Sequence, residues 1–409
     1  MSAPHRVRLD EVVTEAKSGF ACGEEVQNGV FQIRMNNVTR DGRLDTTKKR
    51  LVPSNHKGIP GTLLKEGDVL FNATNSPDLV GKTVMVRNLT EPTVFSNHFL
   101  RLRTDTSRLD PSYLTRWLNA EFQRGTYKSM CRQWVNQATL GRDALLGTGI
   151  SLLDLAEQRR IAEVLDQVDA LREKRRKSIA LLDDLAQSVF LDMFGSAGSE
   201  FRSSTVEELA ANTKNSIRTG PFGSQLRHEE FVDEGIPVLG IDNAVNNEFK
   251  WAKARYITDA KYRQLQRYTV FPGDVLITIM GTCGRCAIVP DDIPTAINTK
   301  HLCCITLDQR ACLPEYLHSY FLQHPVAQQY LRQTAKGAIM SGLNMGIIKS
   351  LPVALPPLRL QESYAQRTRE IREARSTAER HLRQLDELFT SIQSRAFRGE
   401  LWQDDLKDL

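Results

Sequence analysis

The chain has 409 residues, too many for one domain of ordinary size, and 41% of them are apolar, enough for two buried cores. A net charge of +5, from 54 basic and 49 acidic side chains, permits nucleic-acid binding without requiring it. The mean hydropathy of -0.36 argues against an integral membrane protein. The seven irregularly spaced cysteines are typical of reduced thiols, and no apolar signal segment opens the sequence, so we expect a cytoplasmic protein.

The first 150 residues predict a domain of mixed helix and strand. The stretch GDVLF at 67–71 indicates a turn that leads into a strand, and TVMVR at 83–87 and FLRLR at 99–103 are strand-like. PSYLTRWLNAEFQRG at 111–125 predicts a helix with proline at its first position. A long helix follows from Leu155, because no glycine or proline interrupts the sequence and apolar residues recur at helical spacing. At 1.5 Å per residue it extends for about 57 Å, farther than a domain of about 150 residues.

The same pattern then returns. Asp68 in GDVL matches Asp274, 206 positions later, whereas His98 matches His301 at an offset of 203. The long helix also returns, with LLDDLAQSVF at 181–190 matching QLDELFTSIQ at 384–393. The shift from 206 to 203 predicts a three-residue deletion in a loop, and the chain is therefore two copies of one module. In the second copy, strands are expected at 286–290 and 302–307, and PEYLHSYFLQHPVAQQYLRQ at 314–333 is expected to be helical.

The two long helices are predicted to pair with each other. With Ile161 at heptad position a, apolar residues recur at a and d in both copies, and two copies related by a rotation pair in antiparallel fashion. The alternative is that each helix packs only on its own domain. The expected pairing seam comprises Ile161, Val168, Leu171, Leu182, Leu185, Ile371, Leu385 and Leu388.

Several segments resemble the specificity subunit of type I restriction-modification systems, and the resemblance covers essentially the whole chain. They are TGPFGSQL at 219–226, EQRRIAEVLDQVD at 157–169, LLDDLAQSVF at 181–190 and LDELFTSIQSRAF at 385–397. The resemblance implies an α+β chain in which two similar α/β target-recognition domains, in inverted orientation, are joined by a long antiparallel two-helix coiled coil. The expected parts are a first recognition domain at 1–150, a central helix at 151–195, a second recognition domain at 196–353 and a terminal helix at 354–409.

The resemblance also implies the partners. Each domain would read one half of a split target in double-stranded DNA, the helices would dock two modification methyltransferase subunits, and a restriction translocase subunit would join them. The chain itself would catalyse nothing and hold no metal or cofactor, since S-adenosylmethionine, ATP and Mg²⁺ would belong to the partners. Two departures could make the docking sites unequal: KSGFACGEE at 17–25 replaces the Gly-Pro-Phe-Gly loop, and the terminal helix lacks the Glu-Gln-Arg-Arg run.

DNA contacts are expected in polar loops, because Arg forks onto guanine, Gln pairs with adenine and Lys binds phosphate. For any single residue, ordinary solvated surface charge is an open alternative. The candidates are Lys48, Lys49 and Arg50 in the first copy, and Arg218, Ser224, Gln225 and Arg227 in the second.

Two other functions stay open at this point: a coiled-coil scaffold with no DNA role, and an enzyme with two pseudo-symmetric sites. An enzyme should keep matched polar residues, but Asp68 and Asp274 are expected only to organise a turn before a strand. SPDLVGKT at 76–83 lacks the first glycine of a phosphate-binding loop. CGRC at 283–286 lacks a second Cys-x-x-Cys pair for zinc, and the adjacent Cys303 and Cys304 should point to opposite faces of a strand.

Overall fold

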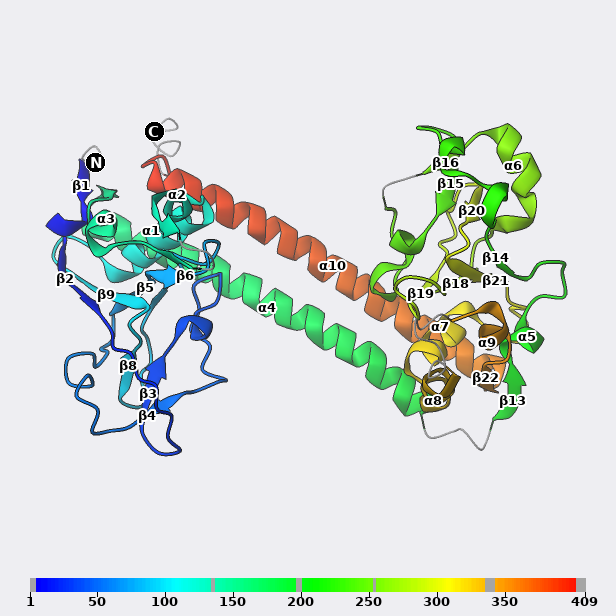
Figure 1. Cartoon of the computed structure of the whole chain (residues 1–409), viewed down its shortest axis with the longest axis horizontal. Helices are drawn as coiled ribbons and strands as arrows, with labels where there is room; N and C mark the ends of the chain where they lie inside the picture. Colours follow the sequence, from blue (N-terminus) through cyan, green and yellow to red (C-terminus); the bar gives the residue numbers. More distant parts are fainter. Residues whose placement is uncertain (1–4, 134–136, 196–200, 253–254, 335–342, 402–409) are drawn as a thin grey trace. The chain divides into compact units, whose positions relative to one another are not determined.

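The computed structural model describes residues 5–133, 137–195, 201–252, 255–334 and 343–401. The chain divides into two units: unit 1 contains residues 1–176 and 381–409, and unit 2 contains residues 177–380. The long helices are α4 (Leu155–Phe194) and α10 (Leu358–Phe397), drawn in green and in orange to red in Figure 1. Each helix contributes one half to unit 1 and the other half to unit 2.

Unit 1 is built on a four-stranded antiparallel sheet with the strand order β2-β9-β5-β7. A second sheet has the order β4-β3-β8, in which β3 and β8 are parallel. The strand pair β1-β12 and the three-stranded sheet β10-β11-β6 complete the unit. The elements before α4 are β1 (His5–Arg8), β2 (Val13–Ser18), β3 (Val30–Ile33), β4 (Leu51–Val52), β5 (Val69–Asn72), β6 (Thr74–Asn75), β7 (Thr83–Met85), β8 (Thr93–Phe95), β9 (Phe99–Thr104), α1 (Pro111–Gln123), α2 (Thr126–Met130), β10 (Arg132–Gln133), β11 (Ala138–Thr139), α3 (Arg142–Leu146) and β12 (Gly149–Leu152).

Unit 2 repeats this architecture with the sheets β14-β21-β18-β19 and β16-β15-β20-β17 and the pair β13-β22. Its parallel pair is β15 and β20. The elements before α10 are β13 (Arg202–Thr205), α5 (Val206–Leu209), β14 (Ile217–Thr219), β15 (Ile236–Leu239), β16 (Tyr256–Ile257), α6 (Asp259–Leu265), β17 (Thr269–Val270), β18 (Val275–Thr278), β19 (Cys286–Ile288), β20 (Ala296–Asn298), β21 (Leu302–Ile305), α7 (Pro314–Gln323), α8 (Pro325–Thr334), α9 (Met345–Lys349) and β22 (Pro352–Leu355).

The predicted strands and the duplication are confirmed, with one correction. The expected single helix at 314–333 is two helices, because His324 has extended backbone and Pro325 starts α8. The three-residue deletion lies between β18 and β19. Asn72 and Gly81, which hydrogen-bond across the corresponding loop of unit 1, match Thr278 and Gly284, which do the same across the shorter loop. The extra residues of unit 1 form β6, which pairs with β11.

The main core of each unit lies between the four-stranded sheet and the helices. In unit 1 it includes Tyr113 and Leu114 of α1, Ile161 and Leu165 of α4, and Phe397 of α10. In unit 2 it includes the matched Tyr316 and Leu317 of α7, Phe190 and Phe194 of α4, and Tyr364 of α10. The start of one long helix therefore packs with the end of the other in both units, which is the predicted antiparallel arrangement. Within the described ranges, no helix is long and apolar enough to cross a membrane.

Candidate nucleic-acid interface

In both units, the loop that follows the first strand of the four-stranded sheet meets the turn that follows the parallel strand pair. We call this place the edge of the unit: residues 19–25 with 96–99 in unit 1, and 220–227 with 299–302 in unit 2. Loops where parallel strands end are common binding sites, because the strands fix the loops while leaving their side chains exposed. The edge is therefore the candidate interface.

Backbone hydrogen bonds build the edge of unit 1. The N–H of Phe20 donates to the carbonyl oxygen of Phe95 (3.3 Å), and the N–H of Asn97 donates to that of Phe20 (3.2 Å). A Cβ on Gly19 would lie 2.2 Å from the Phe95 carbonyl oxygen, so only glycine allows this close approach. The Phe20 ring stacks on His56, with ring centroids 4.4 Å apart.

Unit 2 reaches the same contact with a different loop sequence. The N–H of Gly220 donates to the carbonyl oxygen of Thr299 (3.3 Å). A Cβ on Gly220 would lie 2.0 Å from the Asn298 carbonyl oxygen. The two loops thus follow corresponding strands, β2 and β14, and pass close to the matched backbone turn of their own unit. Beyond that point they present different side chains.

Three of the predicted DNA contacts lie at the edge of unit 2. Ser224, Gln225 and Arg227 are all exposed in the loop that starts at Gly220. The side-chain oxygen of Gln225 accepts from the Tyr268 hydroxyl (2.9 Å), which holds the amide plane in place. The Arg227 guanidinium contacts Glu229 at 3.4 Å, a weak pairing for two exposed side chains. These positions suit DNA contact, which stays a prediction.

The fourth predicted contact of unit 2, Arg218, faces the interior. It is 6% exposed and donates to Asp274 Oδ2 (2.5 Å), Thr306 Oγ1 (2.9 Å) and the carbonyl oxygen of Asn215 (3.1 Å). Asp274 also accepts from the N–H of Phe271 (2.8 Å), which is the predicted turn-organising role. We therefore assign Arg218 a structural role and do not place it at the interface.

Asp68 in unit 1 plays the same part as Asp274. It accepts from the N–H of Lys65 (2.9 Å) and binds the guanidinium of Arg103 (2.6 Å). Both carboxylates are buried and fully engaged with their own unit. Asp68 and Asp274 therefore have a structural role, whereas a pseudo-symmetric enzyme would need matched residues with a catalytic role.

The predicted basic run of unit 1 lies in the loop just before β4 and next to the edge. Lys48 is exposed, Lys49 pairs with Glu91, and Arg50 donates to the carbonyl oxygen of Glu24 (3.1 Å). Arg50 also lies 3.6 Å from Glu25. Arg50 thus reaches the edge loop through Glu24 and Glu25, whereas Lys48 and Lys49 are both exposed and Lys49 forms a surface pair with Glu91.

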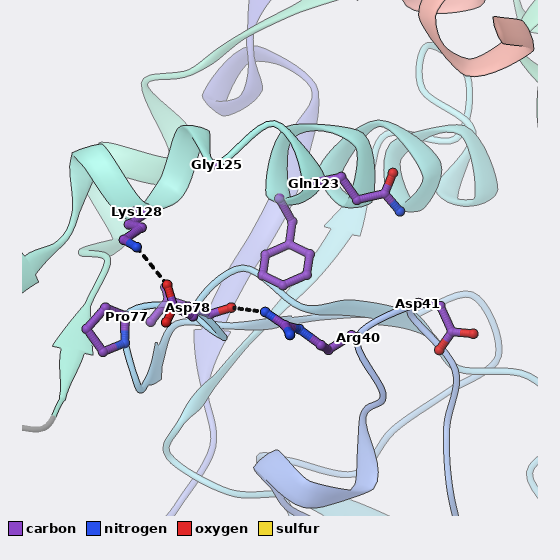
Figure 2. A pocket seen from close by; sticks show the side chains of 9 residues that line it. Arg40, Asp41, Pro77, Asp78, Gln123, Gly125 and Lys128 are labelled. Carbon is purple, nitrogen blue, oxygen red and sulfur yellow. Dashed lines mark hydrogen bonds and ion pairs between the residues drawn. The ribbon is translucent and has the colours of Figure 1, made fainter. Parts of the chain in front are cut away.

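A cavity of about 450 Å³ lies elsewhere in unit 1 (Figure 2). Two cations in the lining of this cavity, Lys128 and Arg40, both bind Asp78. Lys128 Nζ donates to the Asp78 carboxylate (2.7 Å), and Arg40 donates to the Asp78 carbonyl oxygen (3.4 Å). At the duplicated offsets, Lys128 corresponds to Leu331 and Arg40 to Asn246. The two cations are not repeated at the matched positions of unit 2, so we do not include the cavity in a reading surface shared by both units.

The cysteines of unit 2 are part of its core. Cys303 and Cys304 follow each other on β21 and join two different core clusters, so they point to opposite faces as expected. Burial raises the pKa of the Cys303 thiol to about 12. Among the described residues, no group of three potential metal-ligating side chains lies together.

The buried row of the helix pair differs from the predicted seam. Ile161, Leu165, Val168 and Arg172 of α4 form a row spaced by four and three residues, so the second heptad row is position e of our numbering and not d. The d residues Leu171, Leu185 and Leu388 are 50%, 46% and 46% exposed and lie outside the seam. Of the other predicted seam residues, Ile161 and Val168 are buried and Leu182, Ile371 and Leu385 are half-buried.

Arginines in the buried row explain the error, because they interrupt its apolar pattern. In unit 1, Arg172 Nε donates to Asp386 (2.6 Å) and the guanidinium lies 4.5 Å from the Phe389 ring centre. In unit 2, the matched Arg375 Nε lies 2.8 Å from Asp183. At the offset of 203, Asp183 matches Asp386, so both units contain the same ion pair with the helices exchanged.

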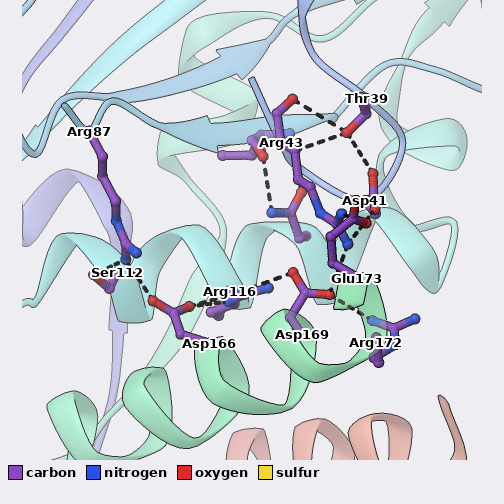
Figure 3. Close-up of polar contacts among 12 residues, drawn as sticks. Thr39, Asp41, Arg43, Arg87, Ser112, Arg116, Asp166, Asp169, Arg172 and Glu173 are labelled. Carbon is purple, nitrogen blue, oxygen red and sulfur yellow. Dashed lines mark hydrogen bonds and ion pairs between the residues drawn. The ribbon is translucent and has the colours of Figure 1, made fainter. Parts of the chain in front are cut away.

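Polar contacts also join α4 to the first domain (Figure 3). Asp166 accepts from Arg116 (2.8 Å) and Arg87 (2.8 Å). Asp169, 3.0 Å from Arg172, links this group to the cross-helix pair. Arg43, from the loop after β3, binds Glu173. Position and orientation of α4 within unit 1 are therefore fixed by charge as well as by the core.

The comparisons with known proteins agree with this architecture. A family model described as the type I restriction modification DNA specificity domain matches residues 221–376. The EcoBI specificity subunit of Escherichia coli is 26% identical over 99% of this chain and 88% of that protein. The putative MjaX specificity subunit of Methanocaldococcus jannaschii is 21% identical over 96% of this chain and 92% of that protein.

Two solved structures share the fold. The S subunit of a type I system from M. genitalium has a TM-score of 0.60 at 13% identity, covering 96% of both chains. A structure titled for complex assembly and conformational transition of the type I R-M system has a TM-score of 0.56 at 17% identity, covering 97% of this chain and 98% of that chain. These two similarities establish the fold, a duplicated α+β unit with two long helices. The chain therefore carries a type I restriction modification DNA specificity domain at residues 221–376, and nearly its whole length is similar to specificity subunits of type I restriction-modification systems.

Proposed function

We propose that each unit reads one half of a bipartite target in double-stranded DNA through its edge. The observation that carries this is the edge itself, which is built twice on one backbone frame and furnished with different side chains. Unit 1 presents Cys22 and Glu24 where unit 2 presents Ser224, Gln225 and Arg227. A common frame with different loops is suited to two different half-sites, because base identity is read by side chains in the grooves.

We propose further that the paired helices dock two methyltransferase subunits and that a restriction translocase subunit joins this core. Leu171 and Leu388 support a docking role, since both are exposed in unit 1. Each precedes a residue of the buried row, which places both on one side of the helix pair. The matched residues of unit 2 are Ala374 and Leu185. A partner present in two copies would meet related but unequal surfaces.

The chain is proposed to be non-catalytic and to act in the cytoplasm. Its matched carboxylates are occupied by the fold, and the reactions that need S-adenosylmethionine, ATP and Mg²⁺ are assigned to the partner subunits. This chain's own task is then to select the DNA sequence at which those reactions occur.

The test is methylation-site sequencing with the chain co-expressed with its methyltransferase partner. We expect one bipartite motif, and exchange of residues 1–150 for those of a relative should change one half of it. Exchange of residues 196–353 is the matched control and should change the other half. A motif altered throughout by either exchange would contradict independent reading, and a methyltransferase whose motif does not depend on this chain would leave only the scaffold function.

A further inference from the structure

Both edges contain a β-turn with histidine at its third position. The N–H of Phe99 donates to the carbonyl oxygen of Ser96 (3.1 Å), and the N–H of Leu302 donates to that of Thr299 (3.1 Å). The carbonyl oxygens of the two histidines, His98 and His301, accept from the neighbouring strand extension at 2.9 Å in each unit. The turn is therefore held in the same way in both units, and its histidine position is fixed by the backbone.

The two imidazoles are half-buried and lie in a positive electrostatic field. Burial lowers the pKa of His98, and Arg34 lowers it further. The pKa of His301 is lowered by burial and then by Lys300 and Arg255. Cations gathered around a group that can itself become positive do not stabilise the fold, but they favour a bound anion.

The source of the positive charge has changed in part between the copies, while the histidine has not. Arg34 immediately precedes a short 3₁₀ helix of unit 1 (Met35–Asn37), and its counterpart at the offset of 206 is Gly240. Lys300 occupies the place of Asn97. Arg255 occupies the place of Arg50, because its carbonyl oxygen accepts from the N–H of Val238 (2.8 Å) as that of Arg50 accepts from the matched Gln32 (2.9 Å). Both imidazoles thus lie near cations although Arg34 and Lys300 stand at unmatched positions, which favours a role of the charge at the edge.

The turn is also continuous with the loop proposed to read bases. Gly19 and Gly220 approach the turn so closely that an added Cβ would lie 2.2 Å or 2.0 Å from a backbone oxygen. The Ser96 and Thr299 hydroxyls, which open the turns, are buried and have no hydrogen-bond partner among the described residues. In each unit the loop and the turn are in direct backbone contact. A ligand that binds to the turn therefore also fixes the position of the loop.

We propose that His98 and His301 each bind one phosphate of the DNA backbone, one in each half of the target; this rests on the proposed function. The phosphate is the same at every base pair, so a residue that contacts it is expected to be kept in both copies of a duplicated reader. Residues that read bases are expected to differ between the copies, as the two edge loops do. Phosphate contacts fix the register of a protein on the duplex, and base contacts supply the specificity.

The experiment measures DNA binding by the assembled complex of this chain and its methyltransferase partner, for the wild type, H98A, H301A and the control H5A, which removes an exposed histidine of β1. Loss of one phosphate contact should weaken binding to cognate and random duplex alike by about tenfold and lower the salt slope by up to about 1. The methylated motif should stay the same, and H5A should bind like the wild type. Affinity unchanged in both histidine variants, or a change of motif, would overturn the inference.

A second measurement does not depend on how the variants fold. Neutral methylphosphonates are placed singly along the cognate duplex. In each half of the target, one position should weaken binding by the wild type. That position should not weaken binding further in the variant, H98A or H301A, that lacks the histidine of that half. Equal sensitivity of wild type and variants at every position would sink the inference while leaving the proposed function standing. A wild-type complex with no sequence-selective DNA binding would instead remove the proposed function, and this inference with it.

Discussion

Gln158 and Gln361, 203 positions apart, make the same three hydrogen bonds at the starts of the two long helices. The Gln158 side-chain nitrogen donates to the carbonyl oxygens of Arg108 (2.8 Å) and Leu153 (2.9 Å), and its oxygen accepts from the N–H of Asp110 (2.8 Å). Gln361 does the same, at 3.0, 2.9 and 2.8 Å, with the three matched positions of unit 2. Both side chains are fully buried. They join each helix to its own domain at a defined angle.

Replacing either glutamine by alanine should destabilise its unit. The change leaves two carbonyl groups and one N–H buried without partners, at a cost on the order of 3 kcal/mol in the free energy of unfolding. Urea unfolding of Q158A and Q361A measures this, with the exposed Gln187→Ala on α4 as the control. Equal stability of Q158A and Q187A would show that the buried bonds contribute little.

The exchanged ion pairs predict a rescue. R172D places two acids together at the helix pair of unit 1 and should lower the stability of that unit, and D386R added to it should recover about 1 kcal/mol of the loss. Arg375 and Asp183 offer the same cycle in unit 2 as an internal replicate. A double variant no more stable than the sum of the single changes would mean that the two side chains do not interact.

The first copy alone should form a homodimer. Arg172 and Asp183 lie on the same helix, so two copies of residues 1–195 can each supply the acid that the other lacks. Phe194 would then take the place of Phe397, which packs against Tyr113 with ring centroids 5.5 Å apart. Sedimentation of the fragment should give a dimer, and D183R should leave it monomeric or aggregated. A stable monomer would contradict the exchange.

The exposed leucines predict unequal docking of the methyltransferase. L171K with L388K should reduce co-purification of that partner and leave the thermal unfolding midpoint nearly unchanged, because both side chains are exposed. The matched surface of unit 2 contains Leu185 and Ala374, so its smaller apolar area should bind more weakly, and a complex with one methyltransferase should precede the complex with two. Native mass spectrometry of a titration separates the two stages. Simultaneous binding of both copies would contradict unequal surfaces.

Acid should destabilise unit 2 through His318. Its Nε2 lies 2.9 and 3.1 Å from the carbonyl oxygens of Asn247 and Cys286. Burial lowers the pKa of His318, and these two hydrogen bonds offset that effect only in part. The unfolded chain therefore binds a proton more readily than the native one. The contribution of His318 is complete above the usual histidine pKa of about 6.5 and falls as the pH drops from there toward the native pKa.

Thermal unfolding between pH 7.5 and 5.5 checks this, with H318Q as a reference that cannot titrate. The difference in stability between wild type and H318Q should shift in favour of the variant as the pH falls. Unit 1 has Thr115 at the matched position and serves as the internal comparison. A difference that stays constant across this range would assign the acid response to other groups.

The duplication made most of the fold predictable, because every matched block constrained two places at once. The seam register was not predictable from apolar spacing, since Arg172 and Arg375 occupy buried rows that their partners across the helix pair make tolerable. The break at Pro325 could have been found from proline alone. Arg218 was misjudged because its buried partner Asp274 is 56 residues away, and no local pattern reveals that contact.

Among the candidate site residues, the sequence pointed to the polar loop of unit 2, which lies at the edge, and did not single out the histidine turns. Their matched positions were visible, yet the cations that surround them come from Arg34 in one unit and from Lys300 and Arg255 in the other. Only the folded chain brings these together. The edge is a property of two distant segments in each unit, and the sequence presents them separately.

The core of unit 1 is completed by Phe389, Ala396 and Phe397, close to the end of α10. A ribosome must therefore translate α10 as far as Phe397 before the core of the first domain can close. Until then the nascent chain exposes the apolar surface that these residues cover, unless a second copy covers it as in the homodimer predicted above. That exposed surface makes a first domain without α10 a target for chaperones and proteases.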